Sequence, residues 1–512
     1  EHVGWRAALF SLGMAVGIAA ALVALLSLVS WPRLFKPLAS ALLLAAAASS
    51  YFMLQYGVVI DSSMMANVVN TDVREARDLL SWSLLVSLLL VAGVPMVWLW
   101  RRPVLRRGFW SQAGRNLVAV LLAVAVLVAV TLATYQDLAS LMRNHKHVRY
   151  LVNPLNVLYG AAKLAIEEPP GTQRPLQAIG LDARLGETYR QQQRPPLVVL
   201  VVGETARAAN FSLGGYARPT NPQLEQLRAG GDLTYFSNVR SCGTNTQASV
   251  PCMFSHLGKT GHESSNQRYE NLLDLLQRAG LAVLWLDNQS GCKGLCERVE
   301  QALTHSLQVP GLCAGGECLD EIMLKDLDLR IAALDRARAA RGVVVVMHQM
   351  GSHGPAYFRR SPPAFKKFLP ECTSNELQNC PRQQLVNAYD NTLVYTDHVL
   401  ASTVRWLEQK SRSGQADTAM LYVSDHGESL GENNLYLHGL PYALASDFQT
   451  RVPMVTWVSP PMQQRLRLRN ACLQKNAALP LSHDNLFHSM LGLLDVQTGL
   501  HKPALDVFAA CR

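Results

Sequence analysis

Apolar residues fill four long runs in the first third of the chain, whereas the remainder has only short apolar runs. The four are Trp5 to Val29, Leu38 to Val59, Leu79 to Trp100 and Leu117 to Tyr135. Each has about 20 residues, the length that a helix needs to cross the hydrocarbon core of a bilayer. The pattern therefore predicts a helical transmembrane domain over residues 1–136.

The arginines orient these spans. Five of them lie between the third and fourth runs, from Arg101 to Arg115. Because Lys/Arg-rich loops stay in the cytoplasm, we expect this loop to lie inside, and residues 61–78 and everything after Tyr135 to lie outside. The same topology places the first residue, Glu1, outside, and no signal peptide precedes it. We therefore expect a further span upstream of this sequence.

Two segments connect the membrane part to the last part of the chain. Gln136 to Ala165 mixes apolar and basic residues, which predicts short helices along the membrane surface. Glu167 to Pro195 is rich in Pro, Gly, Gln and Arg, as linkers are. We assign residues 137–195 to interfacial helices and linker, and residues 196–512 to a water-exposed domain.

Short β-rich apolar runs alternate with helical patterns in that last domain. The apolar runs are Leu197–Val202, Leu281–Leu286, Val343–Met347, Ala419–Val423 and Val452–Val458. The helical patterns are Tyr269–Arg278, Ile322–Ala339 and Gln384–Lys410. This alternation predicts an α/β fold with a mostly parallel sheet and helices on both faces.

The net charge of +9 and the pI of about 9.1 indicate an anionic partner. No Lys/Arg-rich run with interleaved aromatic residues occurs, and many arginines flank the apolar spans. We therefore expect an acidic membrane surface, with its lipids, and no nucleic acid.

All ten cysteines lie after position 240, and none stands in a Cys-x-x-Cys zinc knuckle. An even number in local couples is typical of disulfides in an oxidising compartment. Four couples are close in sequence, and the last pair is assigned by elimination: Cys242 with Cys252, Cys292 with Cys296, Cys313 with Cys318, Cys372 with Cys380, and Cys472 with Cys511.

Polar clusters follow the predicted strands. Asp425 and His426 come directly after the run that ends at Val423, and Glu204 follows Val202. Since the carboxyl ends of parallel strands share one edge of a sheet, these three side chains should meet there. Two carboxylates and an imidazole are three ligands for Zn²⁺, with one position open for chemistry. For the Asp–His pair alone, a capping Asp beside a core His is the competing interpretation.

The segment from Ser241 to Cys252 offers hydroxyl groups for that open position. Thr244 and Thr246 are both candidates, because a bound metal can lower the pKa of a hydroxyl enough to make it a nucleophile. The competing interpretation is an ordinary turn held by a disulfide.

A polar repeat occurs outside the membrane between the second and third spans. Asn67, Thr71 and Glu75 recur every four residues, so one helix would carry them on one face. The face is either a solvated stripe or a surface for a lipid headgroup.

Several long motifs resemble those of the membrane-bound phosphoethanolamine transferases of lipid A, which include the mobilised colistin-resistance enzymes of the alkaline phosphatase and sulfatase superfamily. The motifs are Val201-Val-Gly-Glu-Thr-Ala-Arg207, Ser241-Cys-Gly-Thr-x-Thr with Ser249-Val-Pro-Cys-Met-Phe254, His348-Gln-Met-Gly-x-His-Gly-Pro355, Ala388-Tyr-Asp-Asn391 and Ser424-Asp-His-Gly-Glu-Ser-Leu-Gly-Glu432. The resemblance covers essentially the whole chain.

The resemblance implies roles for individual residues. Glu204, Thr246, Asp425 and His426 would hold a catalytic Zn²⁺, and Thr246 would carry the transferred group. His353 and His438 would bind the phosphate or a second zinc, or pass a proton to the leaving group. Further substrate-binding positions, by match to the family, are Gln289, Ser290, Lys293, Asn67, Thr71 and Glu75.

The implied reaction moves phosphoethanolamine from phosphatidylethanolamine to a phosphate of lipid A through an intermediate on Thr246, which would give resistance to polymyxin. The resemblance places the protein in the bacterial inner membrane with its catalytic domain in the periplasm, and we expect it to act as a monomer. The alternatives are transfer to a core sugar of lipopolysaccharide, or a non-catalytic lipid-binding relative. A sulfatase is disfavoured because Ser249-Val-Pro-Cys252 lacks the Cys-x-Pro-x-Arg context of the modified nucleophile.

Overall fold

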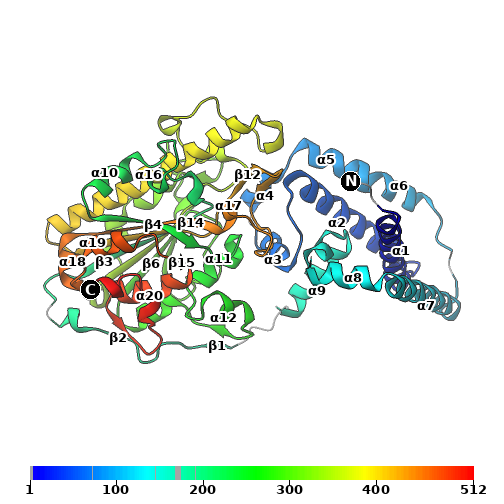
Figure 1. Ribbon diagram of the computed structural model, residues 1–512, viewed down its shortest axis with the longest axis horizontal. Coiled ribbons are helices and arrows are strands. Elements are labelled where there is room, and N and C mark those ends of the chain that lie inside the picture. The colour runs from blue at the N-terminus through cyan, green and yellow to red at the C-terminus, as the bar shows by residue number, and fades with distance from the viewer. Residues whose placement is uncertain (1–3, 72, 106, 145, 168–174, 191) are drawn as a thin grey trace. The chain divides into compact units, whose positions relative to one another are not determined.

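The computed structural model describes residues 4–71, 73–105, 107–144, 146–167, 175–190 and 192–512 (Figure 1). The chain forms two compact units. The helical unit comprises Glu1–Ala66 and Leu80–Pro170, and the sheet unit comprises Asn67–Leu79 and Gly171–Arg512. The three-part division at 136 and 195 expected from the sequence stays a prediction.

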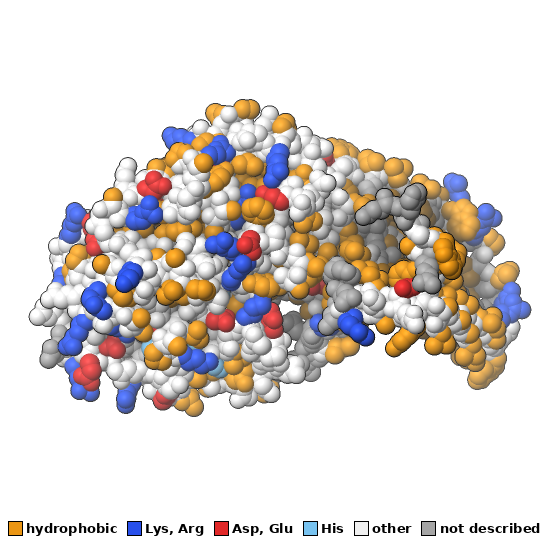
Figure 2. Space-filling model, viewed as in Figure 1, with side chains coloured by type: hydrophobic (Ala, Val, Ile, Leu, Met, Phe, Trp, Pro, Cys, Tyr) orange, Lys and Arg blue, Asp and Glu red, His pale blue; other side chains and the backbone are white. Residues whose placement is uncertain are grey.

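Among the described residues of the helical unit, four helices are long and apolar enough to cross a membrane, which confirms the four predicted spans: Ala7–Leu28, Phe35–Tyr56, Trp82–Arg101 and Phe109–Ala133. They comprise α1 (Trp5–Leu28), α2 (Phe35–Tyr56), α5 (Trp82–Leu88) continuing through a π-turn (Leu89–Gly93) into α6 (Val94–Arg101), and α7 (Phe109–Ala133). Hydrophobic side chains cover their outer surface (Figure 2), as a lipid-facing helix requires.

Short helices follow α7, as the sequence predicts: α8 (Tyr135–Asn144), a 3₁₀ helix (Lys146–Leu151) and α9 (Leu155–Glu167). The outside segment differs from expectation. Asn67 lies on α3 (Ser62–Asn70), Glu75 lies on α4 (Val73–Leu79), and Thr71 lies between the two helices. The three therefore do not share the face of one continuous helix, and the side chain of Glu75 lies outside the described part of the structure.

An eight-stranded sheet forms the centre of the sheet unit, in the order β15-β4-β14-β11-β3-β10-β6-β7. Only β14 runs antiparallel to its neighbours, so the prediction of a mostly parallel sheet is confirmed. The strands are β3 (Pro196–Gly203), β4 (Leu233–Arg240), β6 (Ala282–Asp287), β7 (Glu300–Leu303), β10 (Val343–His348), β11 (Asp417–Ser424), β14 (Arg451–Val458) and β15 (Leu481–Ser482).

Helices cover both faces of this sheet (Figure 1). On one face α16 (Arg382–Arg412) packs on β11, and α10 (Pro222–Ala229) packs on α16. Alternate residues of β3, including Val198 and Leu200, point to the opposite face and join the core made with α11 (Thr246–Met253), α13 (Leu272–Arg278) and α20 (Asp484–Leu493). Because both faces are buried, the central strands are apolar throughout, which is why the sequence revealed them.

Short elements complete the unit. The helices are α12 (Gly258–Ser264), α17 (Asp447–Thr450), α18 (Pro460–Leu466) and α19 (Asn470–Asn476). The strand pairs are β1 (Leu176–Gln177) with β5 (Arg268–Tyr269), β2 (Arg184–Leu185) with β16 (Val496–Gln497), β8 (Cys313–Ala314) with β9 (Glu317–Cys318), and β12 (Ser429–Glu432) with β13 (Leu435–Leu437).

One helix prediction was wrong, and three strands of the central sheet were missed: β4, β7 and β15. The pattern Ile322–Ala339 is not one helix but a 3₁₀ turn (Asp320–Leu324) followed by α14 (Leu327–Ala332) and α15 (Arg336–Ala339). Asp326 adopts a φ of 56°, which ends the first segment, and Asp335 caps α15 anew. Strand β4 was missed because polar residues interrupt its apolar run.

The structure joins all ten cysteines in the predicted couples: Cys242–Cys252, Cys292–Cys296, Cys313–Cys318, Cys372–Cys380 and Cys472–Cys511.

Candidate active site

The register of the parallel strands brings the predicted ligands to one edge of the sheet. Ser424 on β11 pairs with Gly203 on β3, so the residues that follow each strand, Asp425 and Glu204, are neighbours. The first residues after β4 lie at the same edge, since β4 and β11 both run antiparallel to β14. A metal site and a nucleophile loop can therefore meet there.

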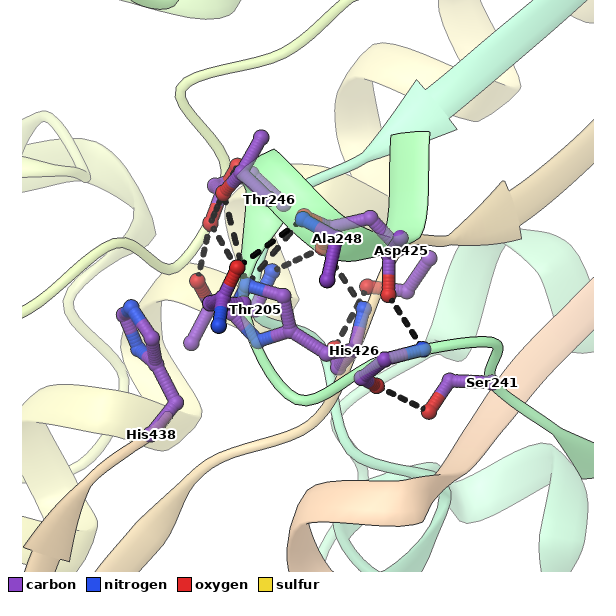
Figure 3. Close-up of polar contacts among 12 residues, drawn as sticks. Thr205, Ser241, Thr246, Ala248, Asp425, His426 and His438 are labelled. Atoms are coloured by element: carbon purple, nitrogen blue, oxygen red, sulfur yellow. Dashed lines mark hydrogen bonds and ion pairs between the residues drawn. The ribbon is translucent and has the colours of Figure 1, made fainter. Parts of the chain in front are cut away.

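Glu204, Asp425 and His426 form a buried cluster in which one ligand atom from each lies within 4.8 Å of the others. His426 Nε2 is 3.5 Å from Glu204 Oε1 and 3.2 Å from Asp425 Oδ2. Figure 3 shows Asp425 and His426 close to Thr246. The predicted three-ligand set is thus assembled in space.

His426 presents a lone pair to this cluster. Its Nδ1 lies 2.9 Å from the carbonyl oxygen of Gly427, which can only accept a hydrogen bond, so Nδ1 carries the proton. Nε2 is then unprotonated in the neutral ring, which is the form that ligates a metal. Burial, with the nearby charge of His438, lowers the pKa of His426 well below its usual range and favours that form.

The two carboxylates also suit a cation. Burial raises the pKa of Glu204 well above its usual range, and the charge of Asp425 adds to this. Burial likewise raises the pKa of Asp425 to about 6. Asp425 Oδ2 is buried and accepts no hydrogen bond from the described residues. Two buried acids side by side resist ionisation unless a positive charge lies between them, so the donor set fits a divalent cation.

Thr246 lies with its hydroxyl against this cluster. Its hydroxyl lies 3.1 Å from Glu204 Oε2 and 3.4 Å from His426 Nε2. It is the first residue of α11, whose N-terminus is capped by the side chain of Asn245. The positive end of that helix favours an anionic oxygen or a phosphate here.

The structure separates the two candidate threonines. Thr244 donates its hydroxyl proton to the carbonyl oxygen of Leu440 at 2.6 Å, so it ties one loop to another. The hydroxyl of Thr246 instead lies against the ligand atoms of Glu204 and His426, as the family motif implies.

His353 and His438 lie beside the cluster. The ring centroids of His438 and His426 are 4.3 Å apart, and those of His438 and His353 are 5.6 Å apart. Burial lowers the pKa of His438, but nearby carboxylates, Glu428 first, outweigh burial and raise the pKa to about 9. Burial and the charge of His438 lower the pKa of His353 well below its usual range.

The remaining predicted residues with described side chains form hydrogen bonds among themselves. The hydroxyl oxygen of Ser290 accepts a hydrogen bond from Lys293 Nζ at 2.9 Å, and the hydroxyl donates one to Gln289 Oε1 at 2.6 Å. The charge of Lys293 contributes to the lowered pKa of His353, so this trio lies near that imidazole. Thr71 donates its hydroxyl proton to the carbonyl oxygen of Asn67 at 2.7 Å.

Sequence reasoning missed three supporting residues. Glu428 accepts a hydrogen bond from His438 Nδ1 at 3.0 Å, and the hydroxyl of Thr205 donates to Glu204 Oε1 at 2.5 Å. His483 accepts from the N–H of Cys242 at 3.0 Å and donates to the carbonyl oxygen of Ser424 at 2.9 Å. Glu428 and Thr205 stand inside the quoted motifs and could have been singled out there, whereas nothing local marks His483.

We expect His483→Leu to destabilise the protein and misplace Thr246. The imidazole joins the loop that precedes Thr246 to β11, and its loss leaves a buried N–H and a buried C=O without partners, at about 1–3 kcal/mol for each group. Denaturant unfolding of the purified variant should show a lower midpoint. An unchanged midpoint would mean that the loop and strand do not depend on this bridge.

Comparison with known proteins gives concordant matches over both units. Residues 18–168 match the family described as "Phosphoethanolamine transferase EptA/EptB", and residues 196–496 match the family described as "Sulfatase". The chain is 42% identical over 501 residues to "Phosphoethanolamine transferase EptA" of Salmonella typhimurium, covering 95% of this chain and 87% of that protein. It is 38% identical over 505 residues to "Phosphatidylethanolamine transferase Mcr-1" of Escherichia coli, covering 95% and 88%.

A solved structure matches the full length. The integral membrane protein lipooligosaccharide phosphoethanolamine transferase A from Neisseria meningitidis superposes with a TM-score of 0.91 at 35% identity. The match covers 99% of this chain and 93% of that chain, so it includes the helices of the membrane part as well as the sheet unit.

Proposed function

The chain belongs to the phosphoethanolamine transferase EptA/EptB family, within the sulfatase superfamily, and on that premise we propose that it transfers phosphoethanolamine from phosphatidylethanolamine to a phosphate of lipid A. It is an integral membrane protein with four spans and a periplasmic sheet unit. The observation that supports a covalent mechanism is the hydroxyl of Thr246, 3.1 Å from Glu204 Oε2 at the edge of a buried Glu204–Asp425–His426 set.

Zn²⁺ is the cofactor that this donor set suits best. Glu204, Asp425 and His426 would hold the ion, with Thr246 as the fourth ligand. When bound, Zn²⁺ would lower the pKa of the Thr246 hydroxyl and draw negative charge from the phosphoryl oxygens. His353 and His438 are the residues that would hold a second ion or the phosphate itself.

The chain's own residues then perform two displacements. In the first, Thr246 Oγ attacks the phosphorus of the phosphodiester, its proton passes to Glu204, and the bond from phosphorus to the diacylglycerol oxygen breaks. That oxygen takes a proton from His438, so diacylglycerol leaves and phosphoethanolamine stays on Thr246. In the second, a phosphate oxygen of lipid A attacks the same phosphorus and the bond from phosphorus to Thr246 Oγ breaks. Thr246 Oγ takes back the proton held by Glu204, and His438 takes up the proton that the lipid A phosphate loses.

The surrounding residues select the headgroup and stabilise charge. Lys293, His353 and His438 neutralise the charge that develops on the phosphoryl oxygens. The ethanolamine headgroup is bound by two groups of residues. They are Gln289 and Ser290 of the sheet unit, and Asn67, Thr71 and Glu75 of the outside segment. Both substrates are lipids of the membrane in which the chain is anchored.

The decisive experiment is a mass spectrum of lipid A from matched cells with and without the protein. We expect lipid A that carries an added phosphoethanolamine, with fragmentation placing the group on a phosphate, and a raised tolerance to polymyxin. If phosphoethanolamine is found only on a core sugar, the acceptor is that sugar and not a phosphate of lipid A. If neither lipid A nor the core is modified, the proposed transferase activity is refuted.

A further inference from the structure

Asp78 lies near the end of the outside segment, Asn67–Leu79, and forms ion pairs with two consecutive arginines, Arg359 and Arg360. Its two carboxylate oxygens accept from Arg359 Nη1 and Arg360 Nη2, each at 2.9 Å. Asn375 Nδ2 donates to the backbone carbonyl of Asp78 at 2.7 Å. The carboxylate is only 6% exposed, so this is a buried attachment rather than a surface ion pair.

Arg360 makes three different contacts from one guanidinium group. Besides Asp78, Nη1 donates to Glu317 Oε2 at 2.7 Å, and Nε donates to the backbone carbonyl of His353 at 3.0 Å. The side chain is 3% exposed. Only the planar fork of an arginine can direct donors to three acceptors in this way, because a lysine has a single charged nitrogen.

The chain between His353 and Arg360 connects the Asp78–Arg360 ion pair to His353 and His438 beside the cluster. Arg360 fixes the backbone at His353, and Tyr357 in the same loop donates its hydroxyl to Glu428 Oε1 at 2.8 Å. The other oxygen of Glu428 accepts from His438 Nδ1 at 3.0 Å. A displacement of this loop would therefore move His353 directly and His438 through one intervening carboxylate.

We propose that Asp78 and Arg360 are positioning residues that couple the outside segment, Asn67–Leu79, to the two histidines beside the reacting phosphorus. The inference rests on the proposed function, because it assigns His353 and His438 to the transferring phosphoryl group. Asp78, together with Glu317, holds the guanidinium that aligns the His353 backbone, so Asp78 acts on the site through a fixed ion pair and not through contact with the substrate.

A purely structural role predicts a different result. If the ion pair only stabilised the fold, its removal would lower the unfolding midpoint, and each molecule that remained folded would react normally. If it positions His353, the rate per folded molecule must fall while the Glu204, Asp425 and His426 ligands keep their metal.

The test measures the rate of phosphoethanolamine loading on Thr246 by the full-length protein in vesicles of phosphatidylethanolamine, by mass spectrometry of the quenched peptide. Metal content and unfolding midpoint are measured alongside. The variants are Asp78→Asn, Arg360→Lys and their double variant, with Asp78→Glu as the conservative rescue. Asp328→Asn is the matched control, since its carboxylate is 60% exposed and pairs with Lys410 at the surface.

We expect Asp78→Asn and Arg360→Lys each to slow loading by about ten- to a hundredfold, because misplacement of a positioned group by a fraction of an ångström to 1 Å has effects of this size. The double variant should be no slower than the slower single variant, since both break one chain of contacts. Asp78→Glu should recover part of the rate, and Asp328→Asn should load normally.

Two outcomes would overturn the inference alone: wild-type loading in Asp78→Asn while the unmodified protein loads normally, or single effects that multiply in the double variant. Failure of the unmodified protein to load Thr246 at all would instead overturn the proposed function, and the inference with it.

Discussion

Replacing Thr246 by alanine will abolish phosphoethanolamine transfer, lowering the rate by about a thousandfold or more. The hydroxyl is the only group at the edge of the Glu204–Asp425–His426 set that the proposed mechanism uses as a nucleophile. Without it no intermediate can form, and a reaction that proceeds in two displacements has no first step. Loss of transfer is measured with the purified variant and lipid A. Loss of the intermediate is measured by the mass of the peptide that contains position 246.

Thr244→Ala is the matched control for that experiment. Its hydroxyl bonds the Leu440 carbonyl instead of the cluster, so the variant should load normally at Thr246 and lose only some loop stability. Thr246→Ser should retain part of the rate because it keeps the oxygen. If Thr246→Ala still decorates lipid A at the normal rate, the covalent mechanism is excluded.

Removing the divalent cation will stop transfer as completely as the loss of Thr246. Glu204 and Asp425 are buried side by side, and burial raises the pKa of both carboxyl groups, so a bound cation would favour their ionised forms and be held by them in turn. A chelator should therefore remove activity and lower the thermal unfolding midpoint, and Zn²⁺ should restore both. At a free concentration one hundred times its Kd, the ion would stabilise the folded protein by ~2.7 kcal/mol.

The substitution Asp425→Asn tests the need for the cation without a chelator. The amide has the shape of the carboxylate but lacks its charge, so the variant should bind less metal and transfer little phosphoethanolamine. Asp328→Asn, an exposed carboxylate on α14, should behave as the unmodified protein does. Normal transfer by the chelated protein would remove the metal from the mechanism.

The sequence was informative about this site wherever a functional residue stands directly beside a strong local pattern. Glu204, Asp425 and His426 each follow an apolar strand that is buried on both faces, so the strand ends could be located and the ligand set predicted. The long motifs then chose Thr246 over Thr244, a choice that the residue types alone left open. The supporting contacts of His483 and Asp78 could not be inferred, because their partners are distant in sequence: 241 residues separate His483 from Cys242, and 282 separate Asp78 from Arg360.

The sequence by itself determined the four apolar helices, the α/β alternation, the cysteine couples and the residue types that would hold a metal. These features depend on the length and period of local runs, which each segment carries on its own. Only the tertiary structure decided that the loop after β4 brings Thr246 beside Glu204 and His426, that Ile322–Ala339 breaks into short helices, and that the segment Asn67–Leu79 belongs with the sheet unit. Those outcomes depend on strand register and on buried hydrogen bonds between distant residues, and such contacts exist only once the chain has folded.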